Sequence, residues 1–338
     1  MTVWVAHVRV PTDVPSTATN LQPALPSAVG PVSDALLDHL ACRAPRRHYV
    51  PVEAPVGDTR PYGHDLQLAL YVCYELHHRG FADVDPRWEW DPGVLQFRAR
   101  MEEAFGTALR DDVGDVSTGT AAAEIRRLCT RPSALAEHLR EHGTWSQVRE
   151  YFVHRSVHRL KIDNAGAWAT YAMTPAEFDR SVSGAPQRST RCRFADVLSA
   201  AGLDDAYLHY LDEVTPEALA LVNMMSMFGL HRNLRGAATG QVAATRITVR
   251  RASAGLLDAL LRLGAPQACV QFYRDHAGPP DGPPRCETVG ALLEREPELE
   301  PDVVLGIRAF ELLEDRFANR LLACWADGRS SLRHLSLR

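Results

Sequence analysis

Hydrophobic residues recur at helical spacing along most of the chain from residue 33 onward. In the segment 64–80, for example, Leu66, Leu70 and Cys73 lie four and three residues apart and therefore share one face. Such a period predicts amphipathic helices, whereas half-buried strands alternate with a period of two. That alternation is nearly absent, and only residues 242–249 are ambiguous. We therefore predict an all-α fold.

The same pattern divides the chain into helices joined by short connections, so neighbouring helices should pack antiparallel in a bundle. Ser33 is the predicted N-cap of the first helix. Residues 1–32, rich in Pro, Ser and Thr and without periodicity, are predicted to form a poorly ordered lead. A helical N-terminal portion (33–145) and a core bundle (146–333) follow. The predicted helices are 34–41, 64–80, 93–109, 119–130, 133–142, 145–162, 192–201, 204–213, 215–234, 236–249, 252–263, 265–276, 287–295 and 301–326.

Composition narrows the function classes. Apolar residues make up 46% of the chain, which suits a folded protein with a sizeable core. A net charge of −5 and an aromatic content of 7% argue against nucleic acid or an anionic membrane as the main partner. We expect no membrane span and no signal peptide, because neither type of apolar segment is found. Seven scattered cysteines without a C-x-x-C pair indicate reduced thiols in a cytoplasmic protein.

The common catalytic motifs are missing from the sequence. It has no G-x-S-x-G elbow, no Walker loop, no H-E-x-x-H pair and no glycine-rich dinucleotide fingerprint. Hydrolase, nucleotide-phosphate and Rossmann functions therefore receive little support.

Two groups of residues could ligate a metal. Glu150, His154 and His158 lie at i, i+4 and i+8, along one helical stripe, and could share an ion with the help of a partner helix. Glu75 and His78 form a Glu-x-x-His pair, which is half of a di-iron carboxylate site in bundle proteins. The alternatives are a polar edge with structural hydrogen bonds for the first group and a helix end for the second.

A third group could form a substrate pocket. Soft Met and Phe side chains line irregular apolar space, and His and Arg side chains can anchor a carboxylate. The alternative is a buried core helix. The candidate substrate-binding residues are Met224, Met225, Phe228, His231, Arg232 and Arg235.

Five short stretches occur in the order that is typical of one family: 70–77 (LYVCYELH), 153–156 (VHRS), 228–237 (FGLHRNLRGA), 296–299 (EPEL) and 330–333 (SSLR). Through these stretches, about residues 34–333 of the chain resemble the bacterial iron-containing redox enzymes with a haem-oxygenase-like fold. The resemblance implies an α-helical bundle that holds two non-haem irons and activates O₂. Substrates in that family are amino acids, fatty acids and natural-product intermediates.

The chain departs from the family at each ligand stretch. Where the family has a Lys-Glu-x-Asp-Pro-His run, residues 161–166 read KIDNAG. Gln241 and Arg246 stand where the family has His and Glu. The family's final His-x-x-x-Asp-x-x-His keeps only His276 in register, and four prolines within 278–284 predict a loop in place of that helix. The resemblance thus implies a di-iron site that is largely lost, and Arg246 would repel metal cations.

Three hypotheses for the function follow. The first is a divergent family member that binds or acts on a small acidic metabolite in a biosynthetic pathway, without the usual di-iron site. The second is an active non-haem iron oxidase or oxygenase with a relocated or single-metal site. The third is an inert scaffold or partner-binding protein. The expected cofactor is therefore none or iron, and the expected partner is a small-molecule metabolite, with homodimer formation compatible with such a bundle. The donors left for a metal are Glu75, Glu150, His154, His158, His276 and Asp281.

Overall fold

The computed structural model describes residues 22–42, 51–158, 190–277 and 287–333, and these contain helices but no strand. The prediction of an all-α fold is confirmed. Among the described helices, none is both long and apolar enough to cross a membrane. The helices are α1 (Pro31–Ala41), α2 (His64–Glu75), α3 (Pro92–Val113), α4 (Ala121–Thr130), α5 (Ala134–His142), α6 (Trp145–Ser156), α9 (Thr190–Ala200), α10 (Pro216–Leu230), α11 (Arg235–Arg262), α12 (Gln267–Ala277), α13 (Glu287–Arg295) and α14 (Glu300–Ala326), with short 3₁₀ turns η1 (Val56–Asp58), η2 (Pro86–Trp90), η4 (Arg232–Leu234) and η5 (Pro297–Leu299).

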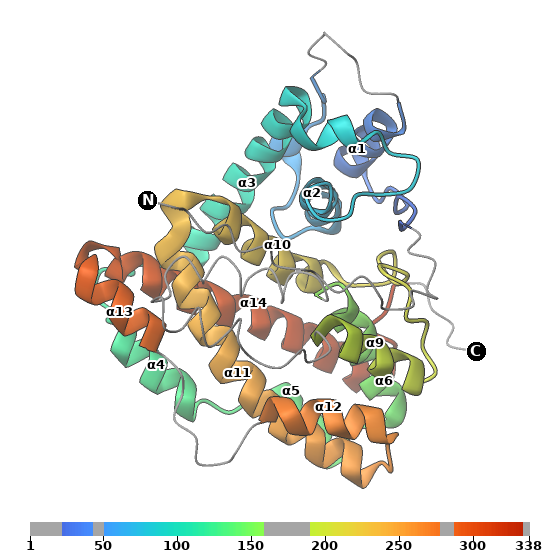
Figure 1. Cartoon of the computed structure of the whole chain (residues 1–338), viewed down its shortest axis with the longest axis vertical. Helices are drawn as coiled ribbons and strands as arrows, with labels where there is room; N and C mark the ends of the chain where they lie inside the picture. The colour runs from blue at the N-terminus through green and yellow to red at the C-terminus, as the bar shows by residue number, and fades with distance from the viewer. Residues whose placement is uncertain (1–21, 43–50, 159–189, 278–286, 334–338) are drawn as a thin grey trace, which may run out of the picture.

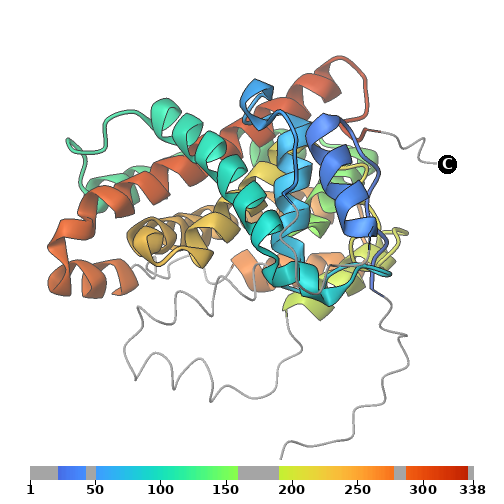
Figure 2. The ribbon, with the colours of Figure 1, turned by 90° about the horizontal axis from the view of Figure 1, so that it is seen from above.

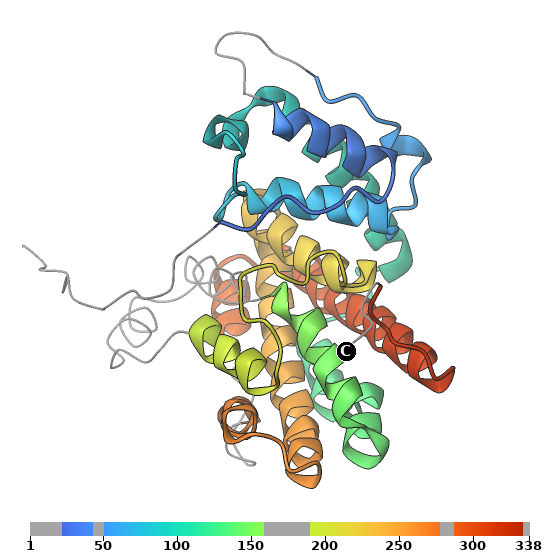
Figure 3. The same cartoon turned by 90° about the vertical axis from the view of Figure 1, so that its right-hand side faces the viewer.

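The helices form two groups, with α10 between them. Helices α1, α2 and α3 lie at one end of the molecule (Figure 1), and the view from above shows them nearest the reader (Figure 2). The other group is built around α11 and α14, with α4, α5, α6, α9 and α12 packed about them (Figure 3). Helices α4 and α5, from the predicted N-terminal portion, thus contact α11 and α14 of the predicted core bundle. The division of the chain at residue 145 stays a prediction.

The backbones of α11 and α14 touch at two glycines. A Cβ atom built on Gly306 would lie far inside van der Waals contact of the Ala237 carbonyl oxygen. A Cβ atom on Gly240 would do the same to the Val303 carbonyl oxygen. Only glycine lets the two helices come this close, so these two positions set the crossing at the centre of the molecule.

Three arginines of α11 cap the ends of other helices. Arg250 donates from Nε to the Ala277 carbonyl at the end of α12 (3.2 Å). Arg251 donates to the Leu128 and Cys129 carbonyls in the last turn of α4. Arg262 donates to the Leu139 and Arg140 carbonyls in the last turn of α5 (2.8 and 2.9 Å). Because the last carbonyls of a helix lack partners and carry partial negative charge, each cation stabilises the end that it caps.

Helix α1 begins three residues earlier than predicted, because its cap comes from another helix. Asp65 of α2 accepts hydrogen bonds from the backbone N–H groups of Val32 and Ser33 (2.9 and 2.7 Å) and from the Ser33 hydroxyl (2.7 Å). Ser33 therefore lies within the first turn and is not the N-cap. A carboxylate that arrives from a distant segment leaves no local signal in the sequence.

Helices α2 and α10 end at Glu75 and Leu230, before their predicted ends at 80 and 234, and larger differences concern 204–213 and 236–263. Residues 204–213 form turns and no α-helix, because the Asp204 side chain accepts from the Ala206 N–H and Leu208 has a positive φ of 59°. The two helices predicted over 236–249 and 252–263 are one continuous helix, α11. No proline or glycine separates them, and the paired arginines at their junction are good helix formers.

Candidate functional site

A cavity of about 680 Å³ lies in the core bundle, where α6, α9, α10, α11, α12 and α14 meet the α4–α5 connection. Its size falls within the range of small-molecule sites. Most of the wall is apolar, so the cavity suits the hydrophobic body of an organic ligand. The apolar lining includes Leu135, Tyr151, Phe194, Leu221, Met225, Leu256, Phe272, Tyr273 and Phe310.

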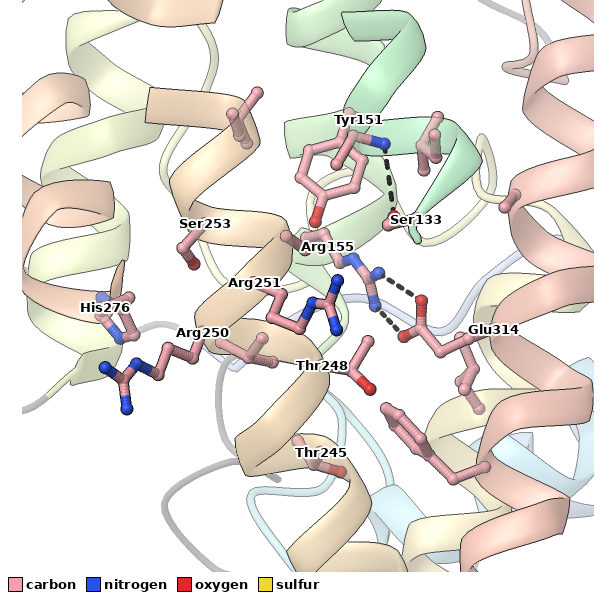
Figure 4. A pocket seen from close by; sticks show the side chains of 18 of the residues that line it. Ser133, Tyr151, Arg155, Thr245, Thr248, Arg250, Arg251, Ser253, His276 and Glu314 are labelled. Carbon is pink, nitrogen blue, oxygen red and sulfur yellow. Dashed lines mark hydrogen bonds and ion pairs between the residues drawn. The ribbon is translucent and has the colours of Figure 1, made fainter. Parts of the chain in front are cut away.

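An ion pair spans one side of this cavity. Arg155 of α6 donates two parallel hydrogen bonds to the Glu314 carboxylate of α14, both of 2.9 Å (Figure 4). The two side chains are only 19% and 18% exposed. Burial alone would lower the pKa of the Arg155 guanidinium, but the charge of Glu314 and the neighbouring Tyr151 hold it above its ordinary value. The pair is therefore charged, and each partner depends on the other.

The other carboxylates of the described lining also have arginine partners. Glu311 accepts from Arg127 and Arg131, both at the α4 side of the cavity. Asp315 accepts from Arg131 (2.7 Å). Asp275 of α12 is paired with Arg193 of α9. These pairs neutralise the negative charge of the wall.

Two lining arginines have no carboxylate partner among the described residues. Arg246 is exposed at the wall of the cavity, and no hydrogen bond or ion pair joins its side chain to another described residue. Within the described parts of the chain, the hydrogen bonds of Arg251 go to the neutral carbonyls that end α4. Since the carboxylates of the wall are already paired, the described lining carries an excess of positive charge.

Hydroxyl groups from α11 add hydrogen-bonding capacity. Thr245, Thr248 and Ser253 all line the cavity and are drawn together with Arg251 and the Arg155–Glu314 pair in Figure 4. The cavity therefore combines a large apolar surface, positive charge and a few hydroxyls. This combination can hold an amphipathic anion.

Two histidines line the cavity. His158 follows the end of α6 and is buried. His276 of α12 lies beside Arg250 (Figure 4), and its Nδ1 is 2.7 Å from the Phe272 carbonyl oxygen. Because a carbonyl only accepts, Nδ1 carries the proton and donates it, which leaves Nε2 for a ligand.

The described donors do not fit a pair of irons. Two ferrous ions bring four positive charges and need several oxygen or nitrogen ligands, mostly carboxylates. The four carboxylates of the wall are held by arginines, and Arg246 adds repulsion. In the parts of the chain that the structure describes, no group of three or more His, Cys, Asp or Glu side chains could hold a metal ion. Asp281 and residues 161–166 lie outside the described residues.

The candidate substrate-binding residues are not gathered at this cavity. Met225 lines it, whereas Met224 and Phe228 are buried in α10 beyond its lining. His231 ends α10 and makes a 2.9 Å hydrogen bond from Nε2 to Glu102 of α3. The remaining two residues lie at the α10–α11 corner: Arg232 is exposed in η4, and Arg235 is paired with Glu296.

The candidate metal ligands are dispersed as well. His158 and His276 share the cavity, but Glu75 is buried at the end of α2, where both of its oxygens accept from Tyr207 (2.9 Å). His154 is fully buried, with Nε2 3.0 Å from the Ser331 hydroxyl. Glu150 accepts from the Ser331 N–H (2.9 Å) and from Trp325 Nε1 (2.8 Å). This network joins α6 to the end of α14 and the segment that follows it.

We expect His154 to make the fold sensitive to acid. Burial, followed by the charges of Arg155 and Arg320, lowers the pKa of His154 to about 3. Its unfolded pKa is about 6.5. Because the folded pKa is depressed, the unfolded chain gains a proton first as the pH falls, and stability is lost below pH 6.5. Between pH 7 and pH 5 this linkage costs about 2 kcal/mol of the free energy of unfolding.

Urea unfolding at the two pH values tests this. His154→Gln keeps a group that can bond to Ser331 but cannot titrate, so the variant should lose about 2 kcal/mol less than the parent protein between pH 7 and pH 5. An unchanged pH dependence in the variant would show that the acid sensitivity comes from other groups.

Sequence reasoning missed the charged residues of the cavity. Arg155 stands within the VHRS stretch of the resemblance, beside the histidine that was singled out. Arg131 and Ser133 come from a connection between two short helices, and Glu314 from the middle of a long amphipathic helix. Nothing local distinguishes these residues from surface charges, because their positions depend on helices that meet only in the folded chain.

Comparison with known protein families gives one match. Residues 184–315 match the family model described as "Iron-containing redox enzyme". The matched segment runs from just before α9 into the middle of α14 and so includes α10, α11 and α12 of the cavity wall. No curated protein matches the chain.

Proposed function

We propose that this chain, whose residues 184–315 match the iron-containing redox enzyme family, is a divergent member that binds a small acidic metabolite in the core cavity. The ligand would be an amphipathic organic anion. Its acidic group would face the α11 arginines, and its apolar part would lie against the aromatic wall.

The observation that carries the proposal is the distribution of charge in the cavity. Glu311, Glu314 and Asp315 are already paired with arginines, while Arg246 and Arg251 face no described carboxylate. An anionic group supplied by a ligand would balance this excess. A positive charge attracts an anion more strongly in a cavity with largely apolar walls than in water. The cavity therefore favours an anion as its ligand.

The proposal includes the loss of the usual di-iron site. We expect under about one iron per chain after expression with added ferrous ion in the presence of O₂. Metal analysis of the purified protein measures this directly. Two bound irons with an O₂-dependent change in absorbance would contradict this part of the proposal and favour an active oxidase.

Anion binding can be tested with a matched pair of probes. Octanoate and octanamide have the same apolar chain, but only octanoate is charged. We expect octanoate at about ten times its Kd to raise the Tm by about 2 °C and octanamide to raise it less. Thermal unfolding of the full chain measures both.

Arginine variants then locate the site. Arg246→Gln should remove the difference between the two probes and leave the Tm of the free protein nearly unchanged, because Arg246 is exposed and unpaired within the described chain. Arg232→Gln is the matched comparison, on the exposed η4 turn. Loss of the octanoate effect in Arg232→Gln alone would place the ligand at the α10–α11 corner, as the sequence predicts. Equal stabilisation by both probes, or none by either, would contradict the proposal.

A further inference from the structure

A second, smaller cleft lies between α10 and α14 and has a volume of about 370 Å³. Glu217 and Ala220 line it from α10, and Leu313, Arg316 and Arg320 from α14, while Tyr62 closes one side. The positions on each helix are three or four residues apart, so each set shares one helical face. The cleft is therefore built by two core helices rather than by loops.

Glu217 lines this cleft, and one of its carboxylate oxygens is unsatisfied. Glu217 lies in the first turn of α10, and its Oε2 atom is buried without a hydrogen-bond partner among the described residues. Leaving such an oxygen unpaired costs free energy, because the water that it loses is not replaced by a donor. A ligand with an N–H donor would satisfy it.

The opposite wall carries guanidinium groups. Arg316 lies 4.1 Å over the Tyr62 ring and is paired with Asp112 through Nη2 (2.6 Å), but its buried Nε has no partner in the described chain. Arg320 is exposed, and no carboxylate of the described residues pairs with it. Glu217 forms no ion pair with either arginine, so their charged atoms lie more than 4 Å apart.

The neighbourhood of His154 places Arg320 near the start of α10. After burial and Arg155, Arg320 is the third contributor to the lowered pKa of His154. His154 Nδ1 in turn accepts from the Thr215 N–H, two residues before Glu217. The cleft thus presents an acceptor, Glu217, and a donor, Arg320, on facing helices.

We propose that this cleft binds a small zwitterion in which an ammonium group and a carboxylate are joined by a short aliphatic spacer. The ammonium donates to Glu217, and the carboxylate accepts from Arg320 and Arg316. Ala220 and Leu313 supply the apolar surface for the spacer. Because the charged atoms of Glu217 and of the arginines lie more than 4 Å apart, the two charges of the ligand need a spacer between them. This site is separate from the core cavity and does not depend on the function proposed for it.

Calorimetric titration of the full chain with 4-aminobutanoate tests the proposal, with butanoate and butylamine as analogues that each lack one charge. We expect 4-aminobutanoate to bind with a Kd of about 1 mM and each analogue to bind about tenfold more weakly. Glu217→Gln and Arg320→Gln should each weaken binding of 4-aminobutanoate about tenfold. The matched controls Glu298→Gln and Arg126→Gln, at exposed positions elsewhere, should have no effect.

The outcomes separate the two sites. Arg246→Gln, in the core cavity, should leave the affinity for 4-aminobutanoate unchanged. No binding up to about 10 mM would overturn the proposal, and the cleft would then hold only water. Equal binding of the zwitterion and both analogues, or weakening by Arg246→Gln without weakening by Glu217→Gln, would overturn it as well.

Discussion

Gly306→Ala should destabilise the protein by about 3 kcal/mol, because the added methyl group has no space between α11 and α14. Its Cβ would collide with the Ala237 carbonyl oxygen, which is backbone and cannot turn aside. The two helices would have to separate, and the packing on both sides of the crossing would loosen. Gly240→Ala should have a similar effect through the Val303 carbonyl. Urea unfolding of the full chain measures the change in the free energy of unfolding.

Gly290→Ala is the matched control. Gly290 also lies in a helix, α13, but a Cβ atom there meets nothing within 4 Å. This variant should be neutral or more stable by about 1 kcal/mol, because alanine favours the helix over the unfolded chain. If Gly306→Ala behaved like Gly290→Ala, the two backbones would not be in contact.

Glu314→Ala should also cost about 3 kcal/mol, since it leaves the guanidinium of Arg155 partly buried without its partner. The pair is bidentate and less than a fifth exposed, so water cannot replace the lost carboxylate fully. Urea unfolding again measures the loss. The double variant Arg155→Met/Glu314→Leu should recover most of it, because no charge is then left unpaired.

The exposed pair Arg329–Asp327 provides the comparison. These side chains are 59% and 61% exposed, and their distance of 2.7 Å is as short as a strong ion pair. Asp327→Ala should nevertheless produce no measurable change, because water solvates both charges in either case. If the Glu314 and Asp327 variants lost stability equally, burial would not explain the strength of the Arg155–Glu314 pair.

Helix positions could be predicted from the sequence far better than contacts between helices. The hydrophobic period located α3, α5 and α14 to within a few residues, because burial of one face determines both the pattern and the helix. The hydrophobic period does not locate a helix correctly where a side chain competes for the backbone N–H groups, as Asp204 does. It also fails where the cap comes from a distant segment, as Asp65 does for α1.

The candidate site was harder to predict. Of the residues that the sequence singled out, Met225, His158 and His276 line the cavity, and their chemical roles stay predictions. Arg155 and Glu314 lie 159 positions apart in the chain, and their pairing depends on how α6 and α14 cross. No periodicity within one helix carries that information, so the electrostatics of the cavity emerge only from the three-dimensional arrangement.

The glycine contact between α11 and α14 limits how this protein can adapt to ligands of different size. Where two main chains touch, there is no side chain left to shorten or lengthen, so the spacing of these two walls is fixed. Variation in ligand dimensions must therefore come from the side chains that line the cavity, which can be exchanged one at a time. A related protein with a wider chamber should have smaller lining side chains and keep both glycines.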